Sequence, residues 1–233
     1  MSDPAESRPA VVFDLDGTLV DTVYQHVLAW REALGEQGID LSVWRIHRRI
    51  GMSGGLLVNA LLRETGRELG AEDVRRLQAA HAAAFGRLLG QVRPLPGAVR
   101  LLHRLSETGI PWAIATSGGR DAALPTLDVL GVRPEVVVTR EEVPYAKPDP
   151  HLFLAAARRL HVAIEESIVV GDSVWDMLAA QRARALGVGL LSGGYGREEL
   201  ERAGAFRVYE DPADLDRHLD ELGIRPPPSA PPQ

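Results

Sequence analysis

Short apolar runs recur along this chain of 233 residues, and each run is bounded by polar residues or glycine. Near-continuous runs of about four or five apolar residues are typical of strands buried on both faces, as in a parallel sheet between helices. From the second run onward, segments with helical periodicity separate the runs, which indicates an α/β core with a doubly wound parallel sheet. The expected strands are Ala10–Phe13, Trp112–Ala115, Val136–Val138, Ile168–Val170, Val188–Leu191 and Phe206–Tyr209. The expected helices are Gly119–Leu130, Pro150–Leu160 and Ser173–Leu186.

The connection after the first run interrupts this alternation, because residues 21–93 show helical spacing and no convincing strand. We therefore predict a helical insertion with a small core of its own, while residues 1–20 and 94–224 form the sheet core. The exit from the insertion, residues 93–97, contains two prolines and lacks two backbone donors, as expected of a hinge. The proline-rich residues 225–233 are expected to be disordered.

The composition of the chain excludes several classes of protein. There is no cysteine, which rules out disulfides, zinc–thiolate sites, iron–sulfur clusters and cysteine nucleophiles. The 26 Lys plus Arg against 32 Asp plus Glu give a net charge of −6, unlike the clustered positive charge of a nucleic-acid-binding protein. No run approaches the roughly 18 apolar residues of a membrane span, and the N-terminal residues lack the apolar segment of a signal peptide. We expect a soluble cytoplasmic protein, a monomer or weak homodimer, with no nucleic-acid or membrane partner.

The basic residues are almost all arginine, since Lys147 is the only lysine in the chain. A coding bias toward arginine would replace lysine wherever any positive charge suffices. Lys147 is then a candidate for a position where the planar fork of arginine cannot replace a compact ammonium.

Polar residues follow four of the expected strands, and in doubly wound sheets ligands bind beyond the carboxyl ends of the strands. The residues are Asp14 and Asp16 after the first strand, Thr116, Ser117 and Gly118 after the second, Lys147 after the third, and Asp172 and Asp176 after the fourth. Asp14 and Asp16 are two residues apart on an extended segment and therefore point to the same side. Crowded carboxylates repel one another unless a cation relieves them, and Mg²⁺, which takes oxygen ligands, suits this set best.

The segment after the second strand offers hydroxyl groups and backbone amides to an anion at a helix N-terminus. Each motif alone has a plain structural explanation: Asp-x-Asp is commonly a turn or a cap, and Ser/Thr-Gly is usually a helix N-cap. All of them in this order, each after an expected strand, predict phosphoryl transfer.

These segments resemble the four motifs of the haloacid dehalogenase superfamily. They are Asp14–Leu19, Thr116–Ser117, Lys147–Pro148 and Gly171–Asp176, and the resemblance runs from about Ala10 to Leu191. Within the superfamily the chain is similar to the phosphoglycolate phosphatase and β-phosphoglucomutase group. The resemblance implies a Rossmann-like catalytic core, with residues 21–93 as a helical cap of the first type.

The resemblance also implies roles for the motif residues. Asp14 would be the nucleophile that forms an aspartyl phosphate, Asp16 the acid and then the base, and Lys147 the group that neutralises nucleophile and phosphate. The implied Mg²⁺ ligands are a carboxylate oxygen of Asp14, the backbone carbonyl of Asp16 and Asp172, with Asp176 acting through a water. The implied phosphoryl-binding residues are Thr116 and Ser117, and Gly118 is a further candidate because its backbone amide lies at the expected helix N-terminus.

Substrate choice in this superfamily comes mostly from the cap. Arg45, His47 and Arg49 precede a glycine-rich stretch, residues 51–55, at the position of the substrate-specificity loop of related enzymes. They are candidate substrate contacts, and a solvated cationic helix face is the alternative.

Three aromatic residues of the cap have other interpretations. His26 shares an apolar stripe with its helical neighbours, so that a packed core histidine and a gate or proton relay both remain open. It is included among the candidate substrate-binding residues. Trp44 and His81 are expected to contribute to the packing of the cap.

The sequence therefore predicts a Mg²⁺-dependent phosphatase for a small phosphorylated metabolite, with sugar phosphates among the candidates. The alternatives are a phosphohexomutase and a non-catalytic phospho-acceptor module like a response-regulator receiver. The long insertion and the acid Asp16 disfavour the receiver. Gly54 follows Ser53 where the mutases carry an arginine, and Thr18 stands where they tend to carry an apolar residue, so hydrolysis is favoured over mutase activity.

Overall fold

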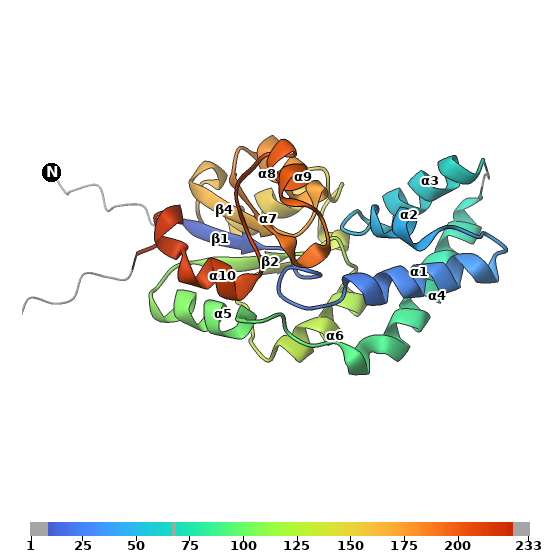
Figure 1. Ribbon diagram of the computed structural model, residues 1–233, viewed down its shortest axis with the longest axis horizontal. Coiled ribbons are helices and arrows are strands. Elements are labelled where there is room, and N and C mark those ends of the chain that lie inside the picture. Colours follow the sequence, from blue (N-terminus) through green and yellow to red (C-terminus); the bar gives the residue numbers. More distant parts are fainter. Residues whose placement is uncertain (1–8, 67–68, 226–233) are drawn as a thin grey trace, which may run out of the picture.

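The computed structural model describes residues 9–66 and 69–225. These residues form a six-stranded parallel sheet in the order β3-β2-β1-β4-β5-β6 (Figure 1). The strands are β1 (Ala10–Phe13), β2 (Trp112–Ala115), β3 (Val137–Val138), β4 (Ser167–Gly171), β5 (Leu186–Leu190) and β6 (Ala205–Tyr209). The predicted strands and the α/β doubly wound fold are confirmed, with strand ends that move by at most two residues.

Helices cover both faces of this sheet. They are α5 (Ala98–Glu107), α6 (Arg120–Leu130), α7 (His151–Arg159), α8 (Val174–Ala183), α9 (Arg197–Arg202) and α10 (Pro212–Arg217). Short 3₁₀ turns are η1 (Leu89–Gln91), η2 (Arg140–Glu142), η3 (Ile164–Glu166), η4 (Leu191–Gly193) and η5 (Leu219–Leu222). The helix predicted up to Leu186 ends at Ala183, because Arg184 adopts a left-handed φ of 65° and the chain turns into β5.

The core lies in two layers, one on each face of the sheet. Val11 and Phe13 of β1 pack in one layer with residues of α5 and α6, whereas Val12 packs in the other with residues of α7 and α8. All four residues of β1 are buried. This two-sided burial explains why the run is apolar throughout instead of alternating.

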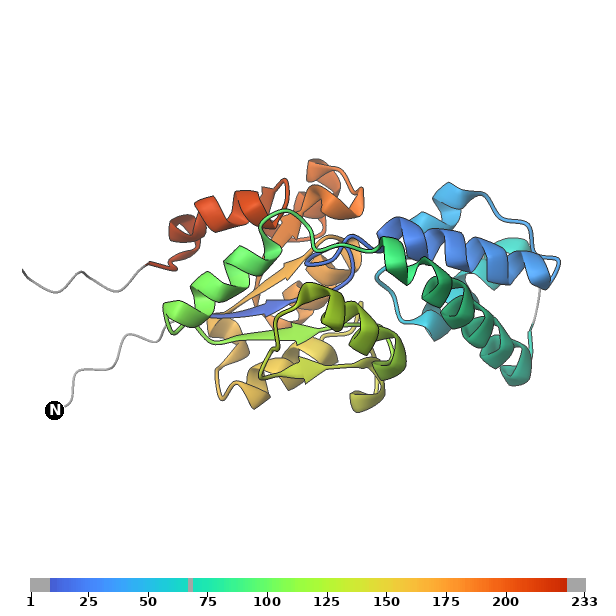
Figure 2. The same cartoon turned by 90° about the horizontal axis from the view of Figure 1, so that it is seen from below.

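The segment between β1 and α5 is helical and has its own apolar core. Its helices are α1 (Val23–Glu36), α2 (Val43–His47), α3 (Gly54–Thr65) and α4 (Ala71–Leu88). Figure 2 shows them as a lobe beside the carboxyl edge of the sheet, with α1 packed along α4. Trp30, Leu57, Leu61 and Leu77 belong to this second core. The expectation that Trp44 packs there is wrong: its ring is 62% exposed and lies beneath the guanidinium of Arg45.

The two connections between this lobe and the sheet core run side by side. The backbone amide of Asp21 donates to the carbonyl of Arg93 at 2.9 Å, and the amide of Leu95 donates to the carbonyl of Leu19 at 2.9 Å. The chain thus enters and leaves the lobe through one paired segment. The tail predicted to be disordered lies outside the described residues from 226 onward. None of the described helices has the length and apolar character needed to cross a membrane.

The order of the strands fixes where a ligand can bind. The chain moves outward from β1 through β2 to β3, and then crosses to β4 on the other side of β1. Ligands of open α/β sheets bind at such a switch point, beyond the carboxyl ends of the strands. The ends of β1, β2 and β4 therefore surround the candidate site.

Candidate active site

Three buried carboxylates meet beyond the ends of β1 and β4. Asp14 follows β1 directly, and its backbone amide donates to the carbonyl of Val170 at 2.9 Å, which holds it beside β4. Asp172 follows β4, and Asp176 lies in the first turn of α8, where it accepts from the amide of Ser173 at 3.0 Å. Oxygen atoms of the three aspartates lie within 4.8 Å of one another. The sequence had placed these residues at one edge, and the structure brings them into one cluster.

Lys147 supplies the positive charge in this cluster. Its side chain is wholly buried, and its ammonium nitrogen contacts a carboxylate oxygen of Asp14 and lies 2.8 Å from Oδ1 of Asp176. Burial alone would lower the pKa of Lys147, but the two carboxylates outweigh it and raise the pKa. The lysine therefore stays charged, with one positive charge against three carboxylates.

The excess negative charge appears in the pKa values of the aspartates. Burial raises the pKa of Asp14 to about 7, and repulsion by Asp176 and Asp16 adds to burial against the opposing effect of Lys147. Burial, together with repulsion by Asp176 and Asp14, raises the pKa of Asp172 well above its usual value. A divalent cation with oxygen ligands would relieve this repulsion, so the residues present fit such a metal ion.

Glycine residues leave room around Asp172. Gly17 has a φ of +79°, and a Cβ atom there would fall 2.5 Å from Oδ2 of Asp172. A Cβ atom at Gly193, in the turn after β5, would overlap the same carboxylate. The Thr18 hydroxyl donates to Oδ1 of Asp172 at 2.9 Å. No role for Gly193 is predicted from the sequence, although a pair of glycines one residue after an expected strand is a sign of close approach.

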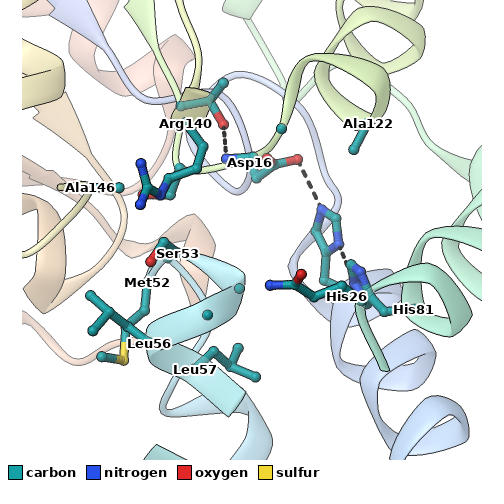
Figure 3. Close-up of a pocket in the computed structure, with 18 of the residues that line it drawn as sticks. Asp16, His26, Met52, Ser53, Leu56, Leu57, His81, Ala122, Arg140 and Ala146 are labelled. Carbon is teal, nitrogen blue, oxygen red and sulfur yellow. Dashed lines mark hydrogen bonds and ion pairs between the residues drawn. The ribbon is translucent and has the colours of Figure 1, made fainter. Parts of the chain in front are cut away.

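Asp16 turns its side chain toward the helical lobe. Its Oδ1 accepts from the hydroxyl of Thr22 at 2.8 Å and lies 3.2 Å from Nε2 of His26 (Figure 3). Burial would raise the pKa of Asp16, but His26 and then Thr22 lower it below its usual value. Among the described residues, the carboxylate cluster that could hold a metal ion does not include this side chain. A metal contact from Asp16 would thus come from its backbone, as the family resemblance implies.

His26 and His81 connect Asp16 to helix α4. Nδ1 of His26 lies 3.1 Å from Nε2 of His81, and the ring of His81 stacks on Trp30 with 4.1 Å between centroids. Burial lowers the pKa of His81 to about 3, so this ring is neutral. Both histidines line the cavity described below. His81 therefore does more than pack the cap. His26 is packed and hydrogen-bonded, with its ring stacked on Phe85 at 4.0 Å between centroids, and it also contacts Asp16, so that a role as gate or proton relay stays a prediction.

The end of β2 supplies groups suited to an anion. The amide of Gly118 donates to the hydroxyl of Thr116 at 2.9 Å, which shapes the turn. The hydroxyl of Ser117 is buried and has no hydrogen-bond partner among the described residues. Both hydroxyl residues line the same cavity as Asp14. Hydroxyl and amide donors at this place can hold the oxygens of a phosphoryl group.

A cavity of about 730 Å³ lies between the lobe and the sheet core, with Asp14 and Asp16 in its wall. On the lobe side the wall includes Met52, Ser53, Leu56 and Leu57, and on the core side it includes Arg140 and Ala146 (Figure 3). The volume is within the range of about 300–1,000 Å³ that small-molecule sites occupy.

The three basic residues expected to touch the substrate lie elsewhere. Arg45 and Arg49 pair with Glu64 on α3, at 3.2 and 2.5 Å. Nε2 of His47 lies 2.8 Å from the carbonyl oxygen of Gly193, so this ring joins the lobe to the core. None of the three is among the residues that line the cavity. Contacts within and between the two parts of the chain occupy these side chains instead.

Comparisons with known proteins agree with this geometry. The profile of the haloacid dehalogenase-like hydrolases matches residues 9–184, and the chain belongs to this family. It is 32% identical to the phosphoglycolate phosphatase of Rhodospirillum rubrum over 93% of this chain and 96% of that protein. It is 33% identical to hexitol phosphatase A of Escherichia coli over 74% of this chain and 78% of that protein.

A solved structure, described as a hydrolase from Pseudomonas syringae, has the same fold. Its TM-score is 0.90 and its sequence is 55% identical, over 92% of this chain and 99% of that one. The chain is thus a phosphoric monoester hydrolase of the haloacid dehalogenase type, which confirms the predicted family and enzyme class.

Proposed function

We propose that this phosphatase uses Mg²⁺ to hydrolyse a small phosphorylated metabolite through an aspartyl phosphate on Asp14. The observation that carries the proposal is the position of Asp14: it lies in the cavity wall, in contact with Lys147 and within the carboxylate cluster. The curated relatives also support it, since they are named for phosphoglycolate and for hexitol phosphates.

The reaction has two steps. A carboxylate oxygen of Asp14 attacks the phosphorus atom, while Asp16 donates a proton to the leaving oxygen of the ester. Because His26 and Thr22 lower the pKa of Asp16, it donates from its minor, protonated form. Asp16, now ionised, takes a proton from the water that attacks the aspartyl phosphate, which releases inorganic phosphate and restores Asp14. Dividing one difficult displacement into two easier ones is the general benefit of a covalent intermediate.

The remaining groups hold the phosphoryl group in place. Lys147 offsets its charge, and the hydroxyl groups of Thr116 and Ser117 donate hydrogen bonds to its oxygens. The amide of Gly118, proposed from the sequence as a further donor, instead holds the hydroxyl of Thr116 in place. The residues that would hold Mg²⁺ are Asp14, the backbone carbonyl of Asp16, Asp172 and, through a water, Asp176. When bound, the ion would supply positive charge that offsets the negative charge of the three carboxylates beyond what Lys147 neutralises.

The helical lobe has a part in this proposal. Residues 21–93 act as a cap over the catalytic core of residues 1–20 and 94–224, with the paired connection as their hinge. His26 orients Asp16, whereas the roles in substrate binding proposed for Arg45, His47 and Arg49 have no support in their positions. We place the protein in the cytoplasm as a monomer or weak homodimer, with neither nucleic acid nor membrane as a partner.

Removal of divalent metal is expected to lower the phosphatase activity to below about 1% of its starting value, because positive charge at the transferring group contributes several kcal/mol. EDTA followed by excess Mg²⁺ tests this in a discontinuous phosphate assay. Mg²⁺ should also raise the melting temperature of the apoprotein, since it relieves the repulsion among the buried carboxylates. Asp172→Asn should weaken both effects, and the exposed Asp128→Asn serves as the matched control. Full activity in EDTA would refute the metal requirement.

Hydrolysis and mutase activity are separable by their products. We expect inorganic phosphate to be the main product from β-glucose 1-phosphate, even with a bisphosphate primer. Gly54 brings no cation to the cavity, and Arg45 and Arg49 are held by Glu64. Phosphorus NMR of one reaction follows both products. Glucose 6-phosphate accumulating faster than phosphate would show that the chain is a mutase.

A further inference from the structure

Besides Asp14 and Asp16, the wall of the cavity includes more acidic than basic residues. Apart from Asp14, Asp16 and the two histidines, the charged residues in its wall are one basic residue, Arg140, and three acidic residues, Asp121, Glu141 and Asp149. The guanidinium of Arg140 already donates to the carbonyl oxygens of Val143 at 2.7 Å and Pro144 at 3.4 Å. A second anionic group on a substrate would therefore enter a region with more carboxylates than cations.

Within residues 21–66 and 69–93, the cap residues that line the cavity include no lysine or arginine. Met52, Leu56 and Leu57 make an apolar wall opposite Asp16 (Figure 3). The polar groups that the cap contributes beside the two histidines are neutral: Ser53, Asn59 and Gln78.

We propose that the cavity selects phosphate esters whose remaining part is uncharged and carries several hydroxyl groups, and that it rejects esters with a second anionic group. The rejected esters include phosphoglycolate, although relatives of the chain are named for it. This inference rests on the proposed function. Hydroxyl groups can exchange their water for the neutral donors and acceptors of the wall. A carboxylate or a second phosphate would lose its water without gaining a free cation, which is costly. The cavity of about 730 Å³ accommodates a molecule of hexose size.

Matched pairs of substrates test the proposal. Glycerol 3-phosphate and 3-phosphoglycerate differ in one terminal CH₂OH or carboxylate, and so do glucitol 6-phosphate and 6-phosphogluconate. We expect kcat/KM to be about 10- to 100-fold higher for the member of each pair that carries CH₂OH in place of the carboxylate. This ratio of kcat/KM should become smaller as the salt concentration is raised. Salt screens the repulsion between the substrate carboxylate and the acidic residues of the wall, but it would not change a preference based on substrate shape.

Two variants test the cause of the discrimination. A Cβ atom at Gly54 would lie 3.6 Å from Gln78 and 3.6 Å from Trp30, an ordinary contact, so Gly54→Arg can place a cation at the cavity wall. It should raise kcat/KM for the two carboxylate substrates about tenfold relative to the matching CH₂OH substrates. Gly86→Arg, where nothing lies within 4 Å of the added Cβ, is the matched control for a cation elsewhere on the cap.

The second variant, Asp121→Asn, removes one of the three acidic residues that line the cavity besides Asp14 and Asp16. It should lower the ratio of kcat/KM between the two members of each pair. Asp128→Asn on the same helix is exposed outside the cavity and should leave it unchanged. Equal or higher kcat/KM for the carboxylate substrates would overturn the inference. So would hydrolysis of p-nitrophenyl phosphate with no turnover of either pair. No hydrolysis of any of these esters, p-nitrophenyl phosphate included, would instead overturn the proposed function.

Discussion

Asp14→Asn is expected to lower kcat by about 10⁴-fold or more while the protein remains folded. The amide nearly matches the carboxylate in shape, but it cannot form the acyl phosphate. The substitution also removes one negative charge from a buried cluster in which burial and repulsion raise the pKa of Asp14 to about 7. We therefore expect no loss of thermal stability. Steady-state kinetics with a good substrate and thermal unfolding followed by circular dichroism measure the two effects.

The control for this substitution is Asp128→Asn, which makes the same chemical change on the exposed face of α6. It should have wild-type kinetics. If Asp14→Asn kept even about a tenth of the wild-type rate, a covalent role for Asp14 would be untenable, since loss of a nucleophile costs orders of magnitude.

Lys147→Arg is expected to lower kcat/KM by about 100-fold or more and to destabilise the fold by about 1–3 kcal/mol, the usual cost of overpacking a buried site. The ammonium is enclosed by Asp14, Asp176 and the ring of Phe153, whose centroid lies 5.3 Å away. The planar guanidinium is bulkier and places its donors in a fixed fork, so it cannot contact both carboxylates in the same space. Kinetics and denaturant unfolding test the two expectations.

Arg202→Lys provides the reverse substitution at a side chain that is 82% exposed, and it should change neither quantity. An active and stable Lys147→Arg enzyme would mean that the single lysine of the chain reflects coding bias and not a requirement of the site.

The sheet core could be predicted because each buried strand is a run of consecutive apolar residues, which a short stretch of sequence shows by itself. Strands buried on both faces must be apolar throughout, as all four residues of β1 are. Once the strands are placed, parallel order brings their carboxyl ends together, which predicts that Asp14, Lys147 and Asp172 are neighbours. In the structure, the first two are in contact and Asp172 lies in the same cluster.

The cap could be predicted as helical but not in its contacts. Helical spacing indicates which face of a helix is apolar, yet it does not show which helices lie side by side. Arg45 and Arg49 are held by Glu64, a partner on another helix of the same cap. His47 contacts Gly193 of the core, and the two residues are too far apart in the sequence for a local pattern to predict this contact. Trp44 satisfies the apolar pattern but lies at the surface.

The position of Asp16 shows the same limit. The strand pattern correctly indicates that Asp16 follows β1 beside Asp14, but its side chain is directed by Thr22 and His26 from the cap. An extended segment fixes the side to which a residue points, whereas the hydrogen bonds that orient the carboxylate depend on tertiary packing.

The central claim is that Asp14 carries the phosphoryl group, and trapping that intermediate tests it most directly. Asp16→Asn lacks the base for the attacking water, while p-nitrophenyl phosphate needs little protonation to leave, so the aspartyl phosphate should accumulate in this combination. Acid quenching followed by borohydride converts an acyl phosphate to the corresponding alcohol, and peptide mass spectrometry locates it. We expect reduction at Asp14 alone, only with substrate present, and none after Asp14→Asn. Reduction at another carboxylate, or none at Asp14 while phosphate is being released, would contradict the account.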